Sequence, residues 1–187
     1  MGFADAYLLE AGRSILIVVD VQEKLLKVIH EADRVTENIV RLISAARSME
    51  VPVLMTTQYA EKLGPTDASV LEAAGEVEVV DKMSFSCLGS DTFRRKLQEY
   101  PGRTQAVLCG VETHVCVNQT AHDLLDEGFV VHLAADAISS RTESNYRFGL
   151  DRLRHVGATV STTESVIFEW LRVAGTDKFR EVSKIVK

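Results

Sequence analysis

Residues 14–22 read SILIVVDVQ, in which the unbroken apolar run 15–19 is followed by an acid and, two residues later, an amide. Apolar runs of strand length with no polar alternation are typical of strands that are covered on both faces, as in parallel sheets. Similar runs recur along the chain, so we expect six strands. Their ranges are 14–19, 51–56, 77–80, 105–109, 130–134 and 158–161.

Helical periodicity fills several of the intervals between these runs. Apolar residues recur at helical spacing within 35–49, 117–125 and 146–156, and Gly128 and Gly157 stand where the last two helices should end. Strand and helix therefore alternate along the chain. This order predicts a doubly wound three-layer α/β/α sandwich, Rossmann-like in arrangement, with a mainly parallel sheet of about six strands.

Composition bounds the number of domains and the kind of partner. The 187 residues, 46% hydrophobic and 26% charged, suit a single domain over residues 1–187. The 21 basic and 27 acidic residues give a formal net charge of -6, and no basic block stands out. We therefore expect no nucleic-acid or anionic-membrane partner, and we favour a small molecule or a protein.

Targeting signals and disulfide patterns are not apparent in the sequence. The strongly apolar stretch 15–19 is far shorter than the roughly 20 residues of a membrane helix, and the first residues lack the basic and apolar regions of a signal peptide. The three cysteines, Cys87, Cys109 and Cys116, form no CxxC pair, which suits free thiols in a reducing compartment. We expect a soluble, cytoplasmic protein.

Polar side chains follow five of the expected strands. The ligand crevice of an open α/β sheet lies beyond the carboxyl ends of its strands, so these side chains should converge. They are Asp20 and Gln22 after the first strand, Thr57, Gln58 and Tyr59 after the second, Asp81 and Lys82 after the third, Cys116 beyond Gly110 after the fourth, and Asp136 after the fifth. An acid, an amine and a thiol in one crevice would supply a base, a cation and a nucleophile.

Cys116 is the candidate nucleophile. It lies where the fourth strand should give way to a helix, and the backbone N–H groups of a helix start, together with a neighbouring lysine, would lower the pKa of its thiol. The alternative is a buried filler on an apolar helix face, which is the commonest fate of a free cysteine. Asp20 could equally be a turn or cap residue, and Lys82 a solvated loop cation.

Cofactor and metal signatures are not found in the sequence. The five histidines lack ligand spacings such as HExxH, no GxGxxG follows the first strand, and no GxxxxGK[ST] occurs. We therefore expect no cofactor and no metal site. The candidate substrate-binding residues offer amide hydrogen bonds and an aromatic wall, although each has a turn or core explanation of at least equal weight. They are Gln22, Gln58, Tyr59 and Phe85.

Separated motifs carry a family resemblance. The chain resembles the isochorismatase-like cysteine hydrolases at the three segments that carry their catalytic residues. In order, these are residues 20–22 (DVQ), Lys82 and residues 110–117 (GVETHVCV). More narrowly, the chain resembles the isochorismatase domain-containing proteins in residues 57–59, 63–66, 82–86 and 179–182. The resemblance spans nearly the whole chain.

The resemblance implies a catalytic triad, with Asp20 as general base, Lys82 as a cation that supports the thiolate, and Cys116 as nucleophile. It also implies a cis peptide bond between Val111 and Glu112, and an oxyanion hole made of the backbone N–H groups of Glu112 and Cys116. The implied reaction is the metal-independent hydrolysis of a small amide (C–N) or related acyl substrate through a thioacyl intermediate.

The sequence differs from two kinds of enzyme in this superfamily, and the differences make two activities less favoured. Nicotinamidases carry an aspartate and two histidine metal ligands after the second strand, whereas residues 57–63 (TQYAEKL) contain no histidine. True isochorismatases cleave a vinyl ether without needing the cysteine that this chain retains as Cys116. Both activities are therefore less favoured than amide hydrolysis. The competing hypothesis is a non-catalytic protein that binds a small molecule or senses oxidants through Cys116.

Residues 166–171 (VIFEWL) bear on assembly. They are more apolar than a terminal surface helix usually is, and they include the only tryptophan. They could simply pack on the sheet. Because members of the family that the chain resembles are commonly oligomeric, we expect a homo-oligomer, a dimer or larger, that uses this surface. The tail 178–187, with Phe179, Val182 and Ile185 at helical spacing, could join it.

Overall fold

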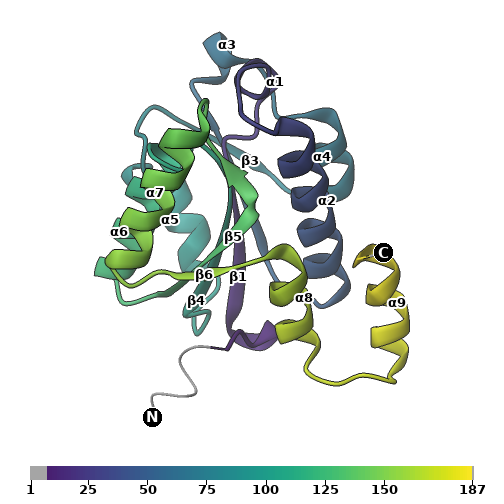
Figure 1. Ribbon diagram of the computed structural model, residues 1–187. Coiled ribbons are helices and arrows are strands. Elements are labelled where there is room, and N and C mark those ends of the chain that lie inside the picture. Colours follow the sequence, from purple (N-terminus) through teal and green to yellow (C-terminus); the bar gives the residue numbers. More distant parts are fainter. Residues whose placement is uncertain (1–7, 187) are drawn as a thin grey trace.

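The computed structural model describes residues 8–186, which are arranged around one sheet (Figure 1). Among these residues six strands form the sheet, and every neighbouring pair is parallel. They are β1 (Ser14–Val19), β2 (Val53–Gln58), β3 (Val79–Lys82), β4 (Gln105–Val111), β5 (Val130–Ser139) and β6 (Thr159–Ser161). Their order, β3-β2-β1-β4-β5-β6, winds outward in both directions from β1 and β4, which confirms the doubly wound topology.

Helices cover both faces of the sheet (Figure 1). One face carries α2 (Ala32–Ser48), α4 (Ala68–Ala74), α8 (Thr163–Leu171) and α9 (Asp177–Val186), and the other carries α5 (Asp91–Gln98), α6 (Cys116–Asp126) and α7 (Glu143–His155). The short helical turns are η2 (Ala11–Arg13), α1 (Glu23–Leu26), α3 (Ala60–Leu63) and η3 (Cys87–Gly89). The expected three-layer sandwich is therefore confirmed.

β1 explains why the apolar run of residues 14–19 is unbroken. Leu16 and Val18 pack in the core on the α2 side of the sheet, and Ile15 and Ile17 pack in the core on the α6 side. All six residues of the strand are buried. Because both faces are covered, a polar side chain without a hydrogen-bond partner would lose its contacts with water and gain nothing in return.

The ends of the elements follow the sequence closely in most places. β1 has the expected bounds, whereas β2, expected at 51–56, runs from Val53 to Gln58. Gly128 and Gly157 follow α6 and α7 with left-handed φ angles of 86° and 107°, the conformation that glycine favours at a helix end.

Asp136 does not lie at the crevice where the sequence predicts it. β5 does not end at Ala134 but continues through Asp136 to Ser139. Asp136 Oδ1 accepts hydrogen bonds from the N–H and Oγ1 of Thr163 at 2.7 and 2.9 Å. Asp136 therefore fixes the start of α8 and does not join the other crevice residues.

Gly110 allows β4 to approach β1 where the strand order reverses. It lies opposite Val19 and has a φ of 109°. A Cβ atom at this position would lie 2.1 Å from the carbonyl oxygen of Val19, so no side chain fits. The crevice beyond this point is where ligands bind in open α/β sheets.

The apolar residues of α8 pack on the sheet. Val166, Ile167 and Trp170 are buried in the same core as α2, and Val182 of α9 joins them. The alternative that these residues pack on the sheet therefore holds for Val166, Ile167 and Trp170, whereas Phe168 of the same helix is 39% exposed. Figure 1 shows α9 beside α8 and α2.

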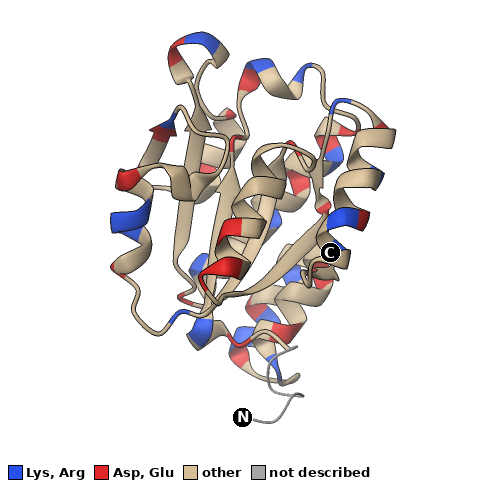
Figure 2. Ribbon diagram, turned by 90° about the vertical axis from the view of Figure 1, so that its left-hand side faces the viewer, with Lys and Arg blue, Asp and Glu red and all other residues tan. Residues whose placement is uncertain are grey.

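Charged residues of both signs are interspersed along the helices (Figure 2). Some of them form ion pairs at helical spacing, such as Lys178 with Glu181 at 2.9 Å. Within residues 8–186, no helix combines the length and the apolar character that crossing a membrane requires.

Candidate active site

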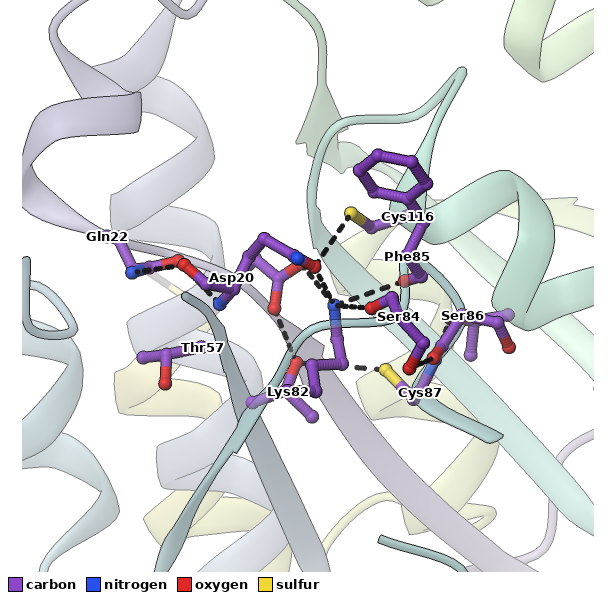
Figure 3. A network of polar contacts seen from close by, with 12 residues as sticks. Asp20, Gln22, Thr57, Lys82, Ser84, Phe85, Ser86, Cys87 and Cys116 are labelled. Carbon is purple, nitrogen blue, oxygen red and sulfur yellow. Dashed lines mark hydrogen bonds and ion pairs between the residues drawn. The ribbon is translucent and has the colours of Figure 1, made fainter. Parts of the chain in front are cut away.

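A buried ion pair lies at the carboxyl edge of the sheet (Figure 3). Asp20 directly follows β1, Lys82 ends β3, and neither side chain is exposed. Lys82 Nζ lies 2.7 Å from Asp20 Oδ2, although β2 separates the two strands in the sheet. Asp20 has a left-handed φ of 52°, a conformation that Asp tolerates better than most residues. The structure thus brings together two residues that the sequence predicts for the crevice.

The Lys82 ammonium is surrounded by oxygen atoms. Four accept from Nζ: Asp20 Oδ2 (2.7 Å), Gln58 Oε1 (2.8 Å), Phe85 O (3.1 Å) and Ser84 O (3.2 Å). An ammonium carries three protons, so these acceptors leave none of them free. The other oxygen of Asp20, Oδ1, accepts from Thr56 Oγ1 at 2.8 Å. These hydrogen bonds offset the loss of hydration, which costs roughly several kcal/mol for each buried ion.

Cys116 is the first residue of α6, and 7% of it is exposed. Its Sγ lies 4.0 Å from Gln58 Oε1, the oxygen that also accepts from Lys82. Burial and, next, the negative charge of Asp20 raise the pKa of the thiol, while Lys82 lowers it by less. The expected lowering of this pKa is therefore wrong, because desolvation outweighs the favourable charge. Burial and the charge of Asp20 thus favour the protonated thiol over the thiolate.

Two backbone donors lie near the start of α6. The peptide bond between Val111 and Glu112 is cis. In the turn that follows, the N–H groups of Val115 and Val117 donate to Glu112 O at 3.0 and 3.2 Å. The N–H groups of Glu112 and Cys116 donate to no backbone acceptor within residues 8–186. They are therefore free to bind an external oxygen atom.

Gln22 and Gln58 play different parts. Gln22 is fully buried, its Nε2 donates to the carbonyl oxygens of Gln58 and Gly64 at 3.1 and 2.7 Å, and its Oε1 accepts from the Gln58 N–H at 2.8 Å. Both of its amide protons are therefore engaged, and Gln22 holds the end of β2 instead of facing a ligand. Gln58, in contrast, places Oε1 between Lys82 and Cys116.

The two aromatic candidates also differ in placement. Tyr59 precedes α3 with a φ of 43°, and its N–H donates to Lys82 O at 3.0 Å, so its backbone has a turn role. Phe85 is 52% exposed, although its carbonyl oxygen accepts from Lys82. Figure 3 shows the Phe85 ring on the side of the network where the Cys116 thiol lies. Phe85 thus borders the site and remains uncovered.

A second thiol adjoins the ion pair, and the sequence did not reveal it. Cys87 is fully buried in η3, and its Sγ lies 3.7 Å from Thr56 Oγ1, the donor to Asp20. Burial and, next, the charge of Asp20 raise the pKa of Cys87 to about 11. The position of Cys87 shortly after Lys82 is the one signal that could have placed it here.

Cys109 and His114 lie outside the network. Cys109 is buried in β4 with Sγ 3.7 Å from Ile17 O, as expected of a packing residue. His114 Nδ1 lies 2.9 Å from Ser140 Oγ. Across the described part of the chain, no three His, Cys, Asp or Glu side chains gather in a way that could hold a metal ion.

Fold and site together define the class of protein. A parallel sheet in this order, with a carboxylate, an ammonium and a thiol near the point where the strand order reverses, is a doubly wound α/β scaffold with ionisable groups at its usual ligand-binding edge. Residues 14–165 match the isochorismatase domain. The chain therefore belongs to the isochorismatase family, as its motifs suggested.

Curated relatives match over most of their length. The chain is 42% identical to the secreted isochorismatase effector Isc1 of Phytophthora sojae over 177 residues, which cover 93% of this chain and 84% of that one. It is 39% identical to isochorismatase domain-containing protein 2 of Xenopus laevis over 173 residues, or 92% and 83% of the two chains. The subgroup suggested by the motifs is therefore confirmed.

Solved structures share the fold. The MAR1 ribonuclease from Caenorhabditis elegans has a TM-score of 0.89 and 33% identity, with 96% of this chain and 92% of that chain covered. The YcaC product of Escherichia coli, described as an octameric hydrolase of unknown specificity, has a TM-score of 0.88 and 22% identity, with 95% and 90% covered. The second likeness shows the fold alone.

Proposed function

We propose that this protein is a metal-independent cysteine hydrolase, in which Cys116 is the nucleophile, Asp20 the general base and Lys82 the cation that fixes the base. The observation that carries the proposal is the fully buried Asp20–Lys82 pair, at 2.7 Å, beside a thiol whose pKa responds to both charges. A perturbed thiol gathered with buried charged side chains at a crevice is typical of functional sites. Membership of the isochorismatase family supports the hydrolase class.

The first half of the reaction acylates the thiol. Asp20 accepts the Cys116 proton while the sulfur forms a bond to the carbonyl carbon of the substrate. The electron pair of the carbonyl moves to its oxygen, which the N–H groups of Glu112 and Cys116 would stabilise. When this pair returns, the C–N bond breaks and Asp20 gives its proton to the nitrogen. An amine or ammonia leaves, and the acyl group stays on the sulfur.

The second half returns the free thiol. Asp20, again a carboxylate, takes a proton from water while the water oxygen attacks the thioester carbon. The C–S bond then breaks and releases a carboxylic acid, and the sulfur regains a proton from Asp20. Thioesters and esters can follow the same route, because only the leaving atom differs.

The raised pKa of Cys116 supports general-base catalysis. A neutral thiol needs a base at the moment of attack, and the carboxylate that raises its pKa is the group that would accept the proton. Lys82 has no free proton, so in this mechanism it acts as a fixed positive charge and not as an acid.

RNA cleavage, which the name of the Caenorhabditis elegans neighbour describes, is less favoured for this chain. RNA binding depends on free basic groups that contact phosphates. This chain has a formal net charge of -6, and the ammonium beside Cys116 is fully engaged. Nicotinamide and isochorismate remain less favoured substrates because residues 57–63 contain no histidine and Cys116 is retained.

A binding or redox-sensing protein is the second candidate function. Two observations favour it: Cys116 is only 7% exposed, and Cys87 places a second thiol in the same network. Such a protein would hold a small molecule without forming a bond to it, or it would be oxidised at Cys116 to a sulfenic acid or disulfide.

Acid-quenched mass spectrometry tests the proposal. The protein is mixed with a set of small amides and thioesters, and peptide mapping follows each cysteine over time. We expect an acyl adduct on Cys116 that water then removes, and no adduct in Cys116→Ser. Stoichiometric binding without any adduct would favour the second candidate.

Assembly and location are further parts of the proposal. We propose a homo-oligomer, in line with the description of YcaC as octameric, and we expect light scattering to give a mass above the 20.7 kDa of one chain. A mass of 20.7 kDa would contradict it. The free state of all three cysteines supports a reducing compartment such as the cytoplasm.

A further inference from the structure

We propose that the substrate of this site carries an uncharged, apolar acyl group that packs on Phe85 and Met83 at the edge of the crevice. This inference rests on the proposed hydrolase function and adds the chemical class of the substrate. Two independent observations carry it. One is the balance of charges around Cys116, and the other is the pair of exposed apolar side chains on the loop after β3.

The described residues around the thiol offer no unpaired positive charge to an anionic substrate. The Lys82 ammonium already donates to four oxygen atoms. Arg141 donates through its backbone N–H and its Nε to Glu112 Oε2, at 2.9 and 3.1 Å. A carboxylate held beside Cys116 would lose its hydration, and the Asp20–Lys82 pair, whose charges offset each other, would not compensate that loss.

A cationic substrate meets the opposite difficulty. Both oxygens of Asp20 are engaged, Oδ1 by Thr56 and Oδ2 by Lys82. A second cation would approach the buried ammonium of Lys82 and would have to share the Asp20 carboxylate with it. The ion pair and the neutral thiol together carry no net charge, so the site suits an uncharged ligand.

The loop between β3 and η3 presents two large apolar side chains. Met83 is 66% exposed and Phe85 is 52% exposed. Their backbone is nevertheless fixed, because Met83 O accepts from Gln58 Nε2 at 2.8 Å and Phe85 O accepts from Lys82 Nζ at 3.1 Å. The residues that surround the thiol therefore fix the backbone of two apolar residues whose side chains are more than half exposed. Such side chains at a crevice are typical of a ligand-binding surface.

Noncovalent binding to the Cys116→Ser protein tests the proposed class without depending on turnover. Benzamide, 4-carbamoylbenzoate and 4-(aminomethyl)benzamide share a ring and an amide and differ in charge. Ligand-observed NMR titrations give their affinities. We expect benzamide to bind at least about tenfold more tightly than either charged analogue, since a buried unpaired charge is costly. Equal or tighter binding of a charged analogue, or no binding of benzamide, would overturn the proposal.

A matched pair of aromatic deletions locates the contact. In the Cys116→Ser background, Phe85→Ala should weaken benzamide binding about two- to tenfold, the usual value of an aromatic contact. Phe168→Ala, on α8 at the opposite face of the sheet, should leave it unchanged. An unchanged affinity in Phe85→Ala, or an equal loss in both variants, would contradict the assigned surface.

Turnover is measured separately on the wild-type protein, so that the two proposals fail in different ways. Selective benzamide binding without any acyl adduct on Cys116 would refute the hydrolase mechanism and support the ligand class. Hydrolysis of the charged amides as fast as benzamide would support the mechanism and refute the ligand class.

Discussion

The two ends of β1 and β4 hold buried polar clusters of different kinds. At the amino ends, Ser14 Oγ accepts from Trp170 Nε1 at 2.9 Å and donates to Glu10 O at 2.8 Å. Gln105 Oε1 accepts from the Glu10 N–H at 2.8 Å, and Gln105 Nε2 donates to Leu8 O at 2.9 Å. The side-chain groups in these contacts are neutral, with the Arg103 guanidinium donating to Ser14 O at 3.0 Å beside them, and the cluster ties α8 and the segment before β1 to the sheet.

At the carboxyl ends the cluster contains Asp20, Lys82 and Cys116, which are charged or ionisable. Neutral hydrogen bonds each add about 1 kcal/mol of stability. A buried ion pair contributes little net stability, because the free energy lost on desolvating the two charges offsets their attraction. Burial of polar groups is therefore no sign of function in this sheet. A buried charge beside a nucleophile is the feature that separates the two ends.

Removal of the Cys116 thiol should have the largest effect on turnover, which depends on the carboxyl end of the sheet. Cys116→Ala is expected to lower turnover by about 10⁴-fold or more, because no other group can form the acyl bond. The free energy of unfolding should change little. Cys109→Ala, a buried thiol of β4 outside the site, is the matched control and should keep turnover. Steady-state rates within tenfold of wild type in Cys116→Ala would remove the proposed nucleophile.

Neutralising the base should separate turnover from thiol reactivity. Asp20→Asn should abolish turnover, yet it should also lower the pKa of Cys116, because the charge of Asp20 raises that pKa and Lys82 would remain. At a given pH more thiolate would then be present. The rate of iodoacetamide alkylation, mapped by peptide against pH, should shift to lower pH. An unshifted profile would show that Asp20 does not act on the thiol, and Asp136→Asn is the control.

Loss of the cation should cost both stability and turnover. Lys82→Ala leaves a buried carboxylate unpaired, and breaking a buried pair in this way costs about 3–5 kcal/mol of unfolding free energy. Denaturant unfolding measures this loss, and the double variant with Asp20→Asn should recover part of it. A steady-state rate of Lys82→Ala within about threefold of wild type, which is less than 1 kcal/mol, would refute its catalytic role.

The smallest effect is expected at the neutral end. Trp170→Phe keeps an aromatic ring in the core but removes the donor to Ser14, so the free energy of unfolding should fall by about 1 kcal/mol. Turnover should stay at the wild-type value. A loss of activity without a loss of stability would mean that the two ends of the sheet are coupled.

The sheet could be predicted because its central strands are apolar runs covered on both faces. The end of β5 could not be predicted. Its last residues include Asp136, which pairs with Thr163, and Ser139, whose Oγ donates to His30 O at 2.7 Å. Both partners lie far along the chain, and a local pattern of polar residues does not reveal them.

The meeting of Asp20, Lys82 and Cys116 could be expected from topology, since each follows the carboxyl end of a strand or lies on it. The engaged amide of Gln22 and the placement of Cys87 could not. The direction of the thiol pKa was missed for the same reason. All three depend on how many atoms from distant segments cover a group, and that quantity is set only when the layers pack.

The depth of the Asp20–Lys82 pair has a consequence for how the protein responds to its medium. Neither side chain is exposed, so dissolved ions do not reach the pair. Surface pairs are screened over about 8 Å at physiological ionic strength, and a pair such as Lys96 with Glu78, whose carboxylate side chain is 69% exposed, weakens as salt is added. The attraction between the two charges beside Cys116 is therefore expected to be the same at low and at high salt concentration.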